Sequence, residues 1–145
     1  MYQTLLEGHS GFRYVVMLTL IGSVVFSLTC WLGRKKFTDS NKRINLFTLI
    51  SAHIQFLLGL VLYFLSPFVK TEDMAGAMKD ATLRYWTVEH SIMMLIAIIL
   101  ITIGYSKSKK IVDDVVKHRT VSIFYGLALI IILVAIVLSG RPIIG

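Results

Sequence analysis

Long apolar runs alternate with short polar segments along the chain. Four runs, at residues 14–33, 44–68, 85–105 and 121–139, approach the roughly 20 apolar residues that a helix needs to cross a bilayer. They are continuously apolar, without the alternation of a barrel strand. Inside lipid such runs satisfy their own backbone only as helices. The pattern therefore predicts an all-α integral membrane protein, a single domain over residues 1–145, folded as an up-down bundle with helices near 10–33, 44–68, 85–105 and 117–139.

Composition and charge support this class and add an orientation. The 145 residues are 56% hydrophobic, above the roughly 45–50% of soluble domains. Ten of the fifteen Lys and Arg residues lie in two segments, 34–43 and 107–119. The positive-inside bias places these segments in the cytoplasm, so both termini and the middle loop are predicted on the outer, periplasmic side. Topology thus accounts for the net charge of +7, and no nucleic-acid partner is expected.

Motifs of soluble-enzyme chemistry are missing from the sequence. It has no glycine-rich phosphate loop, nucleophile elbow or HExxH helix. Its single cysteine, Cys30, can form neither an intramolecular disulfide nor a two-cysteine metal site. These absences leave the four histidines as the main candidates for chemistry.

Each histidine falls on a different predicted helix or at its end. His9 and His90 lie toward the outer side, whereas His53 and His118 lie toward the inner side. In an up-down bundle the first and third helices are diagonal neighbours, and so are the second and fourth. Each pair can therefore face across the core. Depths counted from the midpoints of the spans place the two members of each pair about 14 Å apart along the membrane normal. A single site between His53 and His90 is therefore kept as an alternative to two paired sites.

Two interpretations of these histidines compete. Any one of them can simply form a hydrogen bond across the bundle, but ionisable side chains at membrane depth usually mark a pathway or a bound group. Haem uses paired neutral imidazoles in an apolar site and cations near its propionates. On this reading the iron ligands are His9, His53, His90 and His118. Cations for the propionates are Arg13, Arg84 and Arg119, and side chains for the haem faces are Phe12, Phe56 and Met94.

Several segments resemble a known group of proteins. They are "HSGFRY", "AHIQFLLGLVLYFLSP", "VEHSIMMLIAIILITIG" and "KHRT", and they are similar to short bacterial membrane proteins catalogued as cytochrome B. More broadly, four histidines on successive helices resemble the core of the two-haem cytochrome b-561 type, whose flanking helices this chain lacks. The resemblance implies haem b, with two haems per chain favoured and one as the alternative. It also implies ligand pairs His9–His90 and His53–His118.

The function implied is electron transfer in the bacterial inner membrane. The chain would exchange electrons with a quinol or a redox complex, as a carrier or oxidoreductase subunit rather than a self-contained enzyme. So thin a bundle also suggests a homodimer or a hetero-complex. Two other classes stay open: a haem-free accessory or assembly subunit, and a small metal or proton transporter that uses His53, Glu89 and His90.

Overall fold

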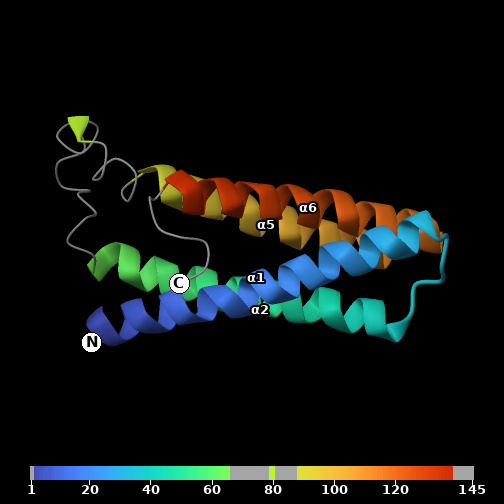
Figure 1. Ribbon diagram of the computed structural model, residues 1–145, viewed down its shortest axis with the longest axis horizontal. Helices are drawn as coiled ribbons and strands as arrows, with labels where there is room; N and C mark the ends of the chain where they lie inside the picture. Colours follow the sequence, from blue (N-terminus) through green and yellow to red (C-terminus); the bar gives the residue numbers. More distant parts are fainter. Residues whose placement is uncertain (1, 66–78, 81–87, 139–145) are drawn as a thin grey trace.

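Four long helices form one bundle in the computed structural model, which describes residues 2–65, 79–80 and 88–138 (Figure 1). They are α1 (Tyr2–Leu32), α2 (Asp39–Leu65), α5 (His90–Lys110) and α6 (Asp114–Leu138). Each is long and apolar enough to cross a membrane. The prediction of an all-α, multi-pass membrane protein built on a four-helix bundle is thus confirmed.

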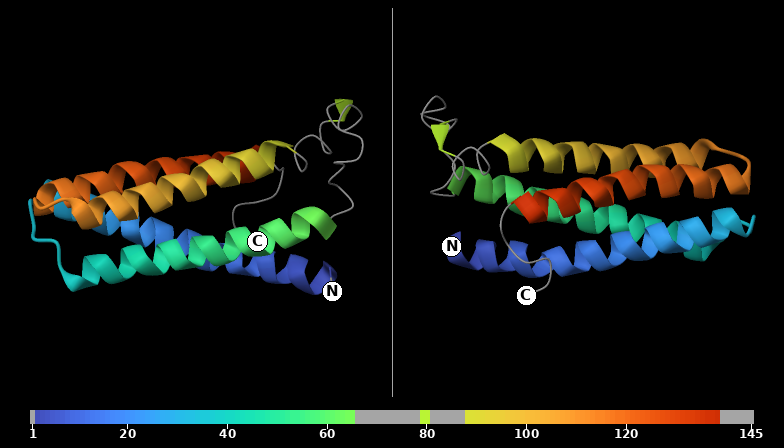
Figure 2. Two further views of the ribbon diagram at one scale, coloured as in Figure 1. Left: turned by 180° about the vertical axis from the view of Figure 1, so that it is seen from behind. Right: turned by 45° about the horizontal axis from the view of Figure 1, so that its top comes forward.

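The helices follow one another around the bundle. Helix α1 packs against α2 and α6, and α5 packs against α6 and, more sparsely, α2. Helices α1 and α5 are therefore diagonal, as are α2 and α6, in agreement with the predicted arrangement. Figures 1 and 2 show that the start of α1 and the end of α6 lie at the same end of the bundle, opposite the short connections at 33–38 and 111–113. That this shared end faces outward stays a prediction from the charge pattern.

All four helices extend beyond their apolar runs, and α6 begins at Asp114 instead of near residue 117. Helix α1 begins at Tyr2 instead of near residue 10, α2 at Asp39 instead of 44, and α5 continues to Lys110. Polar and basic residues can continue a helix outside the hydrocarbon, so apolar length underestimates helix length. In consequence His9, predicted at the lip of a helix, lies inside α1. The predicted start of the third helix at residue 85, and Arg84 before it, lie outside the described residues.

Both short connections carry sequence signals for helix ends. Thr38 precedes α2, and its backbone N–H and its hydroxyl donate to Asn41 Oδ1 at 3.0 and 2.9 Å, so the Asn41 side chain makes the return bond of a capping box. Asp113 Oδ1 accepts from the N–H of Val116 at 3.2 Å and caps α6. Helix α1 ends in a Schellman motif, in which Lys35 N–H donates to the Cys30 carbonyl, and Arg34 takes the left-handed position with φ 50°.

Small side chains line the interior, and large apolar side chains face outward. The centre of the bundle is formed by a cluster of buried residues: Leu20, Ala52, Ala97, Ile98, Ile101, Tyr105, Val121, Tyr125 and Ala128. Leu18 and Phe64, by contrast, are three-quarters exposed. With lipid outside, helices associate through close backbone approach at small residues. Gly104 of α5, packed directly on Phe124 of α6, is one such position.

Candidate functional site

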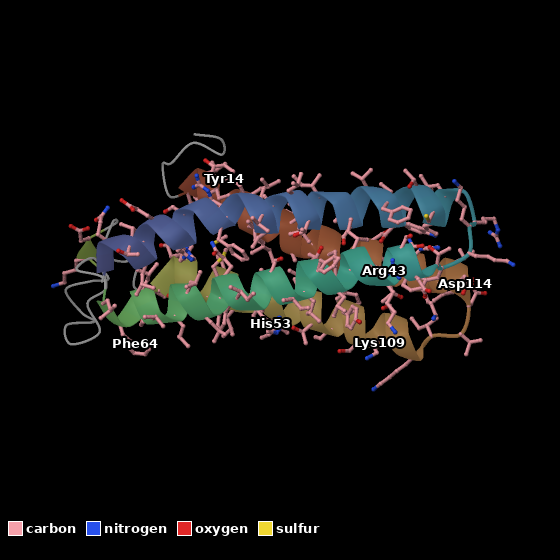
Figure 3. All side chains as sticks on the ribbon, turned by 90° about the horizontal axis from the view of Figure 1, so that it is seen from below. Tyr14, Arg43, His53, Phe64, Lys109 and Asp114 are labelled. Atoms are coloured by element: carbon pink, nitrogen blue, oxygen red, sulfur yellow. The ribbon has the colours of Figure 1, made fainter. Side chains whose placement is uncertain are left out.

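His53 lies near the middle of α2, at the seam between α2 and α5 and away from α1 (Figure 3). Its Nδ1 is 2.8 Å from the carbonyl oxygen of Leu49, one turn earlier. A carbonyl only accepts hydrogen bonds, so in the neutral ring the proton is on Nδ1 and Nε2 carries a lone pair. Thr102 Oγ1 is 3.5 Å from Nε2, but its hydroxyl donates to Ile98 O at 2.7 Å. Nε2 of His53 is therefore an acceptor without a strong donor at hand.

A cavity of about 290 Å³ lies beside His53, between α2 and α5. Apart from His53 and Thr102, its walls are hydrocarbon, contributed by Phe56, Ile98, Ile99 and Ile103. The His53 side chain is exposed on the lipid-facing side of the seam rather than enclosed in the bundle centre. The site thus combines one directed imidazole lone pair with an apolar cleft at mid-membrane depth.

His118 has a different environment from the one predicted for a partner of His53. It is fully buried near the start of α6, and its Nε2 lies 3.0 Å from the carbonyl of Lys35, so Nε2 carries the proton. The Phe37 ring packs against the imidazole, with centroids 5.4 Å apart. Helices α2 and α6 begin at the same end, and their residues 53 and 118 are at least about 15 Å apart in depth, whether counted from the helix starts or from the contact of Tyr125 with Asn45. The arrangement does not bring His53 and His118 together.

His9 packs on the backbone of α2. A Cβ placed on Gly59 would lie 3.2 Å from His9 Cε1, so this glycine lets the imidazole approach the helix. Gln55 Nε2 also donates to the His9 carbonyl at 2.8 Å. Gln55 therefore faces α1 while His53 faces α5, as expected from their separation of about 200° around the helix.

These contacts also give the depth of His90. His9 is level with Gly59, and His53 is level with Thr102. Counting twelve residues outward from Thr102 places His90 level with the end of α2, about 9 Å from the depth of His9. The outer pair is thus closer in depth than the predicted 14 Å, and the predicted order is reversed, because His9 lies deeper than His90. His90 is about 18 Å from the level of His53, so these two do not face one iron.

The other predicted contact residues are spread over the bundle. Arg13 is half-buried, donates from Nη2 to the Tyr14 hydroxyl at 2.9 Å and stacks on the same ring. Phe12 and Met94 are half-buried, whereas Arg119 is exposed at the opposite end. Only Phe56 shares the cavity with His53. Within residues 2–65, 79–80 and 88–138, no group of three or more His, Cys, Asp or Glu side chains lies close enough to hold a metal ion.

Sequence reasoning missed two features of this region. Thr102 lines the cavity, and as a hydroxyl inside the apolar run "LIAIILITIG" it was a usable signal. A buried polar cluster in the half of the bundle near the short connections was also missed, although its residues recur at helical spacing on three helices. Its members are Ser23, Ser27, Cys30, Asn41, Asn45, Thr48, His118, Ser122 and Tyr125.

Comparisons of the chain with protein-family models, with curated proteins and with solved structures find no match. The fold and the site define the class of this protein as a four-helix membrane bundle with a directed histidine at mid-depth.

Proposed function

We propose that this protein is a b-type membrane cytochrome that carries electrons through haem held by histidines of the bundle. The observation that supports this best is the hydrogen bond from His53 Nδ1 to Leu49 O, which leaves Nε2 with its lone pair on a residue that lines an apolar cleft. Histidines that bind metals in proteins commonly donate their second ring N–H to a carbonyl, which fixes the tautomer and the ring orientation. His53 meets this requirement before any metal binds.

The residues around His53 fit an axial ligand and an apolar macrocycle. Haem, when bound, supplies a reversible one-electron couple. Leu49 O would hold the imidazole in its tautomer, and Phe56 with the isoleucines of α5 would exclude water from the haem faces. The His118 side chain fits less well, because its Nε2 proton is already donated to Lys35 O. In our proposal His53 is therefore the inner ligand without His118.

The outer pair, His9 and His90, forms the second proposed haem site. The two residues lie on diagonal helices, both are half-buried, and their difference in depth is smaller than predicted. Arg13 follows His9 by one turn and would be the cation for a propionate. Two haems per chain thus remain the favoured number, with a single haem as the alternative.

The proposed setting is the bacterial inner membrane, with both termini outside. Such a bundle would act as an electron carrier or a subunit of a redox complex, exchanging electrons with a quinol or a protein partner. A homodimer or a hetero-complex would cover the seam between α2 and α5, where large apolar side chains such as Leu57 are exposed.

A pyridine haemochrome assay on the protein purified from haem-replete cells tests this proposal. We expect non-covalent haem b, because the chain has no CxxCH attachment motif. His53→Ala should lose the inner haem, whereas His118→Ala should keep it. Thr102→Val, which preserves shape and leaves Leu49 untouched, is the matched control and should also keep it.

Two results would contradict different parts of the proposal. Protein without haem would refute the cytochrome function and favour a haem-free accessory subunit. Loss of the same haem in His53→Ala and His118→Ala would instead favour the ligand pairing implied by the resemblance. It would also mean that His118 leaves the Lys35 carbonyl when haem binds.

A further inference from the structure

Polar side chains fill the interior of the bundle half that adjoins the short connections. Helices α1, α2 and α6 each present three of them at positions i, i+4 and i+7, which lie on one face of a helix. All nine are buried in the bundle: Ser23, Ser27, Cys30, Asn41, Asn45, Thr48, His118, Ser122 and Tyr125. This polar cluster lies apart from the lipid-facing cavity at His53, and its interpretation does not depend on the proposed function.

Part of the polar cluster is satisfied by protein groups. Ser23 Oγ donates to Asn45 Oδ1 at 3.1 Å and lies 3.0 Å from Thr48 Oγ1. The Tyr125 hydroxyl crosses the bundle and donates to the Asn45 carbonyl at 2.9 Å. These bonds fix Asn45 of α2 at the level of Tyr125 of α6.

Three buried polar atoms of this cluster have no hydrogen-bond partner among the described residues: Asn45 Nδ2, Ser122 Oγ and His118 Nδ1. Their residues are 1%, 8% and 0% exposed, so bulk solvent does not reach them. A buried donor or acceptor without a partner costs about 1–3 kcal/mol. Three such atoms in one cluster indicate that something inside the bundle completes their hydrogen bonds.

The three atoms follow one another along α6. His118 and Ser122 are one turn apart, and Tyr125, which marks the level of Asn45, is one turn further. Four residues of helix rise about 6 Å, and the three from Ser122 to Tyr125 rise about 4.5 Å. Two hydrogen bonds that meet at one water oxygen span about 4.5–5.6 Å, depending on the angle between them, and the side chains supply the remaining reach. One small molecule therefore fits each step, from Asn45 to Ser122 and from Ser122 to His118.

We propose that two internal water molecules bind at this polar cluster. Asn45 Nδ2 donates to the first water, which donates to Ser122 Oγ. The Ser122 hydroxyl donates to the second water, which donates to His118 Nδ1. This order fits the tautomer of His118, whose Nε2 proton is donated to the Lys35 carbonyl. The chain of hydrogen bonds thus runs without conflict from mid-bundle to the connection at 33–38.

The surroundings select water over other ligands. None of the nine side chains of the polar cluster is charged apart from what His118 can carry, so a bound ion would have no counter-charge. Leu20, Ala52 and Ala128, all buried, lie one turn beyond Ser23, Thr48 and Tyr125 and close the cluster toward the other half of the bundle. The ligand must be small and must both donate and accept, and buried waters typically make about three hydrogen bonds.

Radiolytic footprinting of the full chain in lipid nanodiscs tests this proposal. X-ray pulses turn bound water into hydroxyl radicals in place, so internal water oxidises neighbouring side chains that bulk solvent cannot reach. We expect oxidation of Tyr125, which has no exposed surface. Ser122→Val removes the central hydroxyl and fills its space, and it should abolish this oxidation. Ser108→Ala is the matched control and should leave it unchanged, because Ser108 Oγ already donates to Tyr105 O at 2.7 Å.

Protection of Tyr125 in the wild-type protein would overturn the proposal, and so would oxidation that Ser122→Val leaves unchanged. A second measurement needs no variant in case Ser122→Val does not fold. In wild-type protein labelled with ¹⁵N-histidine in bilayers, magnetisation should pass from water to the ring of His118. Failure of this transfer would also overturn the proposal.

Discussion

Replacement of Gly104 by alanine tests the close contact between α5 and α6. A Cβ on Gly104 would lie 2.6 Å from Phe124 Cβ, whereas ordinary contact begins at 3.4 Å. The two helices would therefore have to separate locally by the difference, 0.8 Å. Phe124 Cβ is fixed to the backbone of α6, so no side-chain rotation can relieve the overlap.

The energetic balance of this substitution can be worked out from the contact. Overpacking that forces backbone shifts costs about 1–3 kcal/mol, and alanine recovers up to about 1 kcal/mol through its higher helix propensity. Because the backbone itself must move, we expect a net loss of about 1–2 kcal/mol in the free energy of unfolding. Gly126→Ala on α6 is the matched control. No heavy atom lies within 4 Å of its Cβ position, so it should be neutral or stabilising.

Reversible unfolding in mixed micelles of increasing SDS content, followed by circular dichroism, measures both variants. The informative quantity is the difference in the free energy of unfolding between Gly104→Ala and Gly126→Ala. Both variants gain the same helix propensity, so this contribution cancels in the difference. Equal stability of the two variants would refute the described contact between α5 and α6. Haem content of Gly104→Ala is a second readout, since α5 also carries the wall of the cavity at His53.

Three further predictions concern the connections. Arg34→Gly should stabilise the protein by about 1 kcal/mol, since glycine adopts the left-handed position of φ 50° without steric cost, whereas Arg34→Ala should give no gain in the same unfolding assay. Thr38→Ala should lower the free energy of unfolding by about 1 kcal/mol through loss of the hydrogen bond from its hydroxyl to Asn41 Oδ1, and Thr38→Ser should retain this bond; equal effects would contradict this role of the hydroxyl. Reporter fusions after Lys36 and after Lys109 should both read cytoplasmic. An external signal at either would refute the charge argument, and disagreement between them would refute the described pairing of helix ends.

The number and approximate position of the helices could be predicted because apolar length is a one-dimensional property of the chain. The rotation of each helix about its axis is not such a property, so it could not be predicted in the same way. Helix α2 is apolar on almost every side around His53, so hydrophobic periodicity does not identify its inner face. The polar residues Asn41, Asn45 and Thr48 could have done so. His53 lies about 80° around the helix from Asn45 and about 140° from Thr48, away from the bundle centre.

The partners of the histidines could not be predicted for a related reason. His53 and His118 are held by backbone carbonyls, of Leu49 and Lys35. Every residue has a carbonyl, so the sequence carries no signal for such a bond, and His118 and Lys35 are 83 positions apart. Depths counted from span midpoints were also wrong for the outer pair, because the midpoints of the apolar runs are not level: Ser23, near the midpoint of the first run, contacts Asn45, near the start of the second.

The packing of α1 against α6 joins the first helix to the last one synthesised. Until α6 enters the membrane, Ser23 and Asn45 can bond to each other within the first hairpin. His118 and Tyr125 gain their partners at Lys35 and Asn45 only when the second hairpin docks on the first. A chain truncated before α6 would therefore leave one side of its polar interior open to lipid. Insertion of α6 should therefore decide when the polar interior of a newly made chain is closed to lipid.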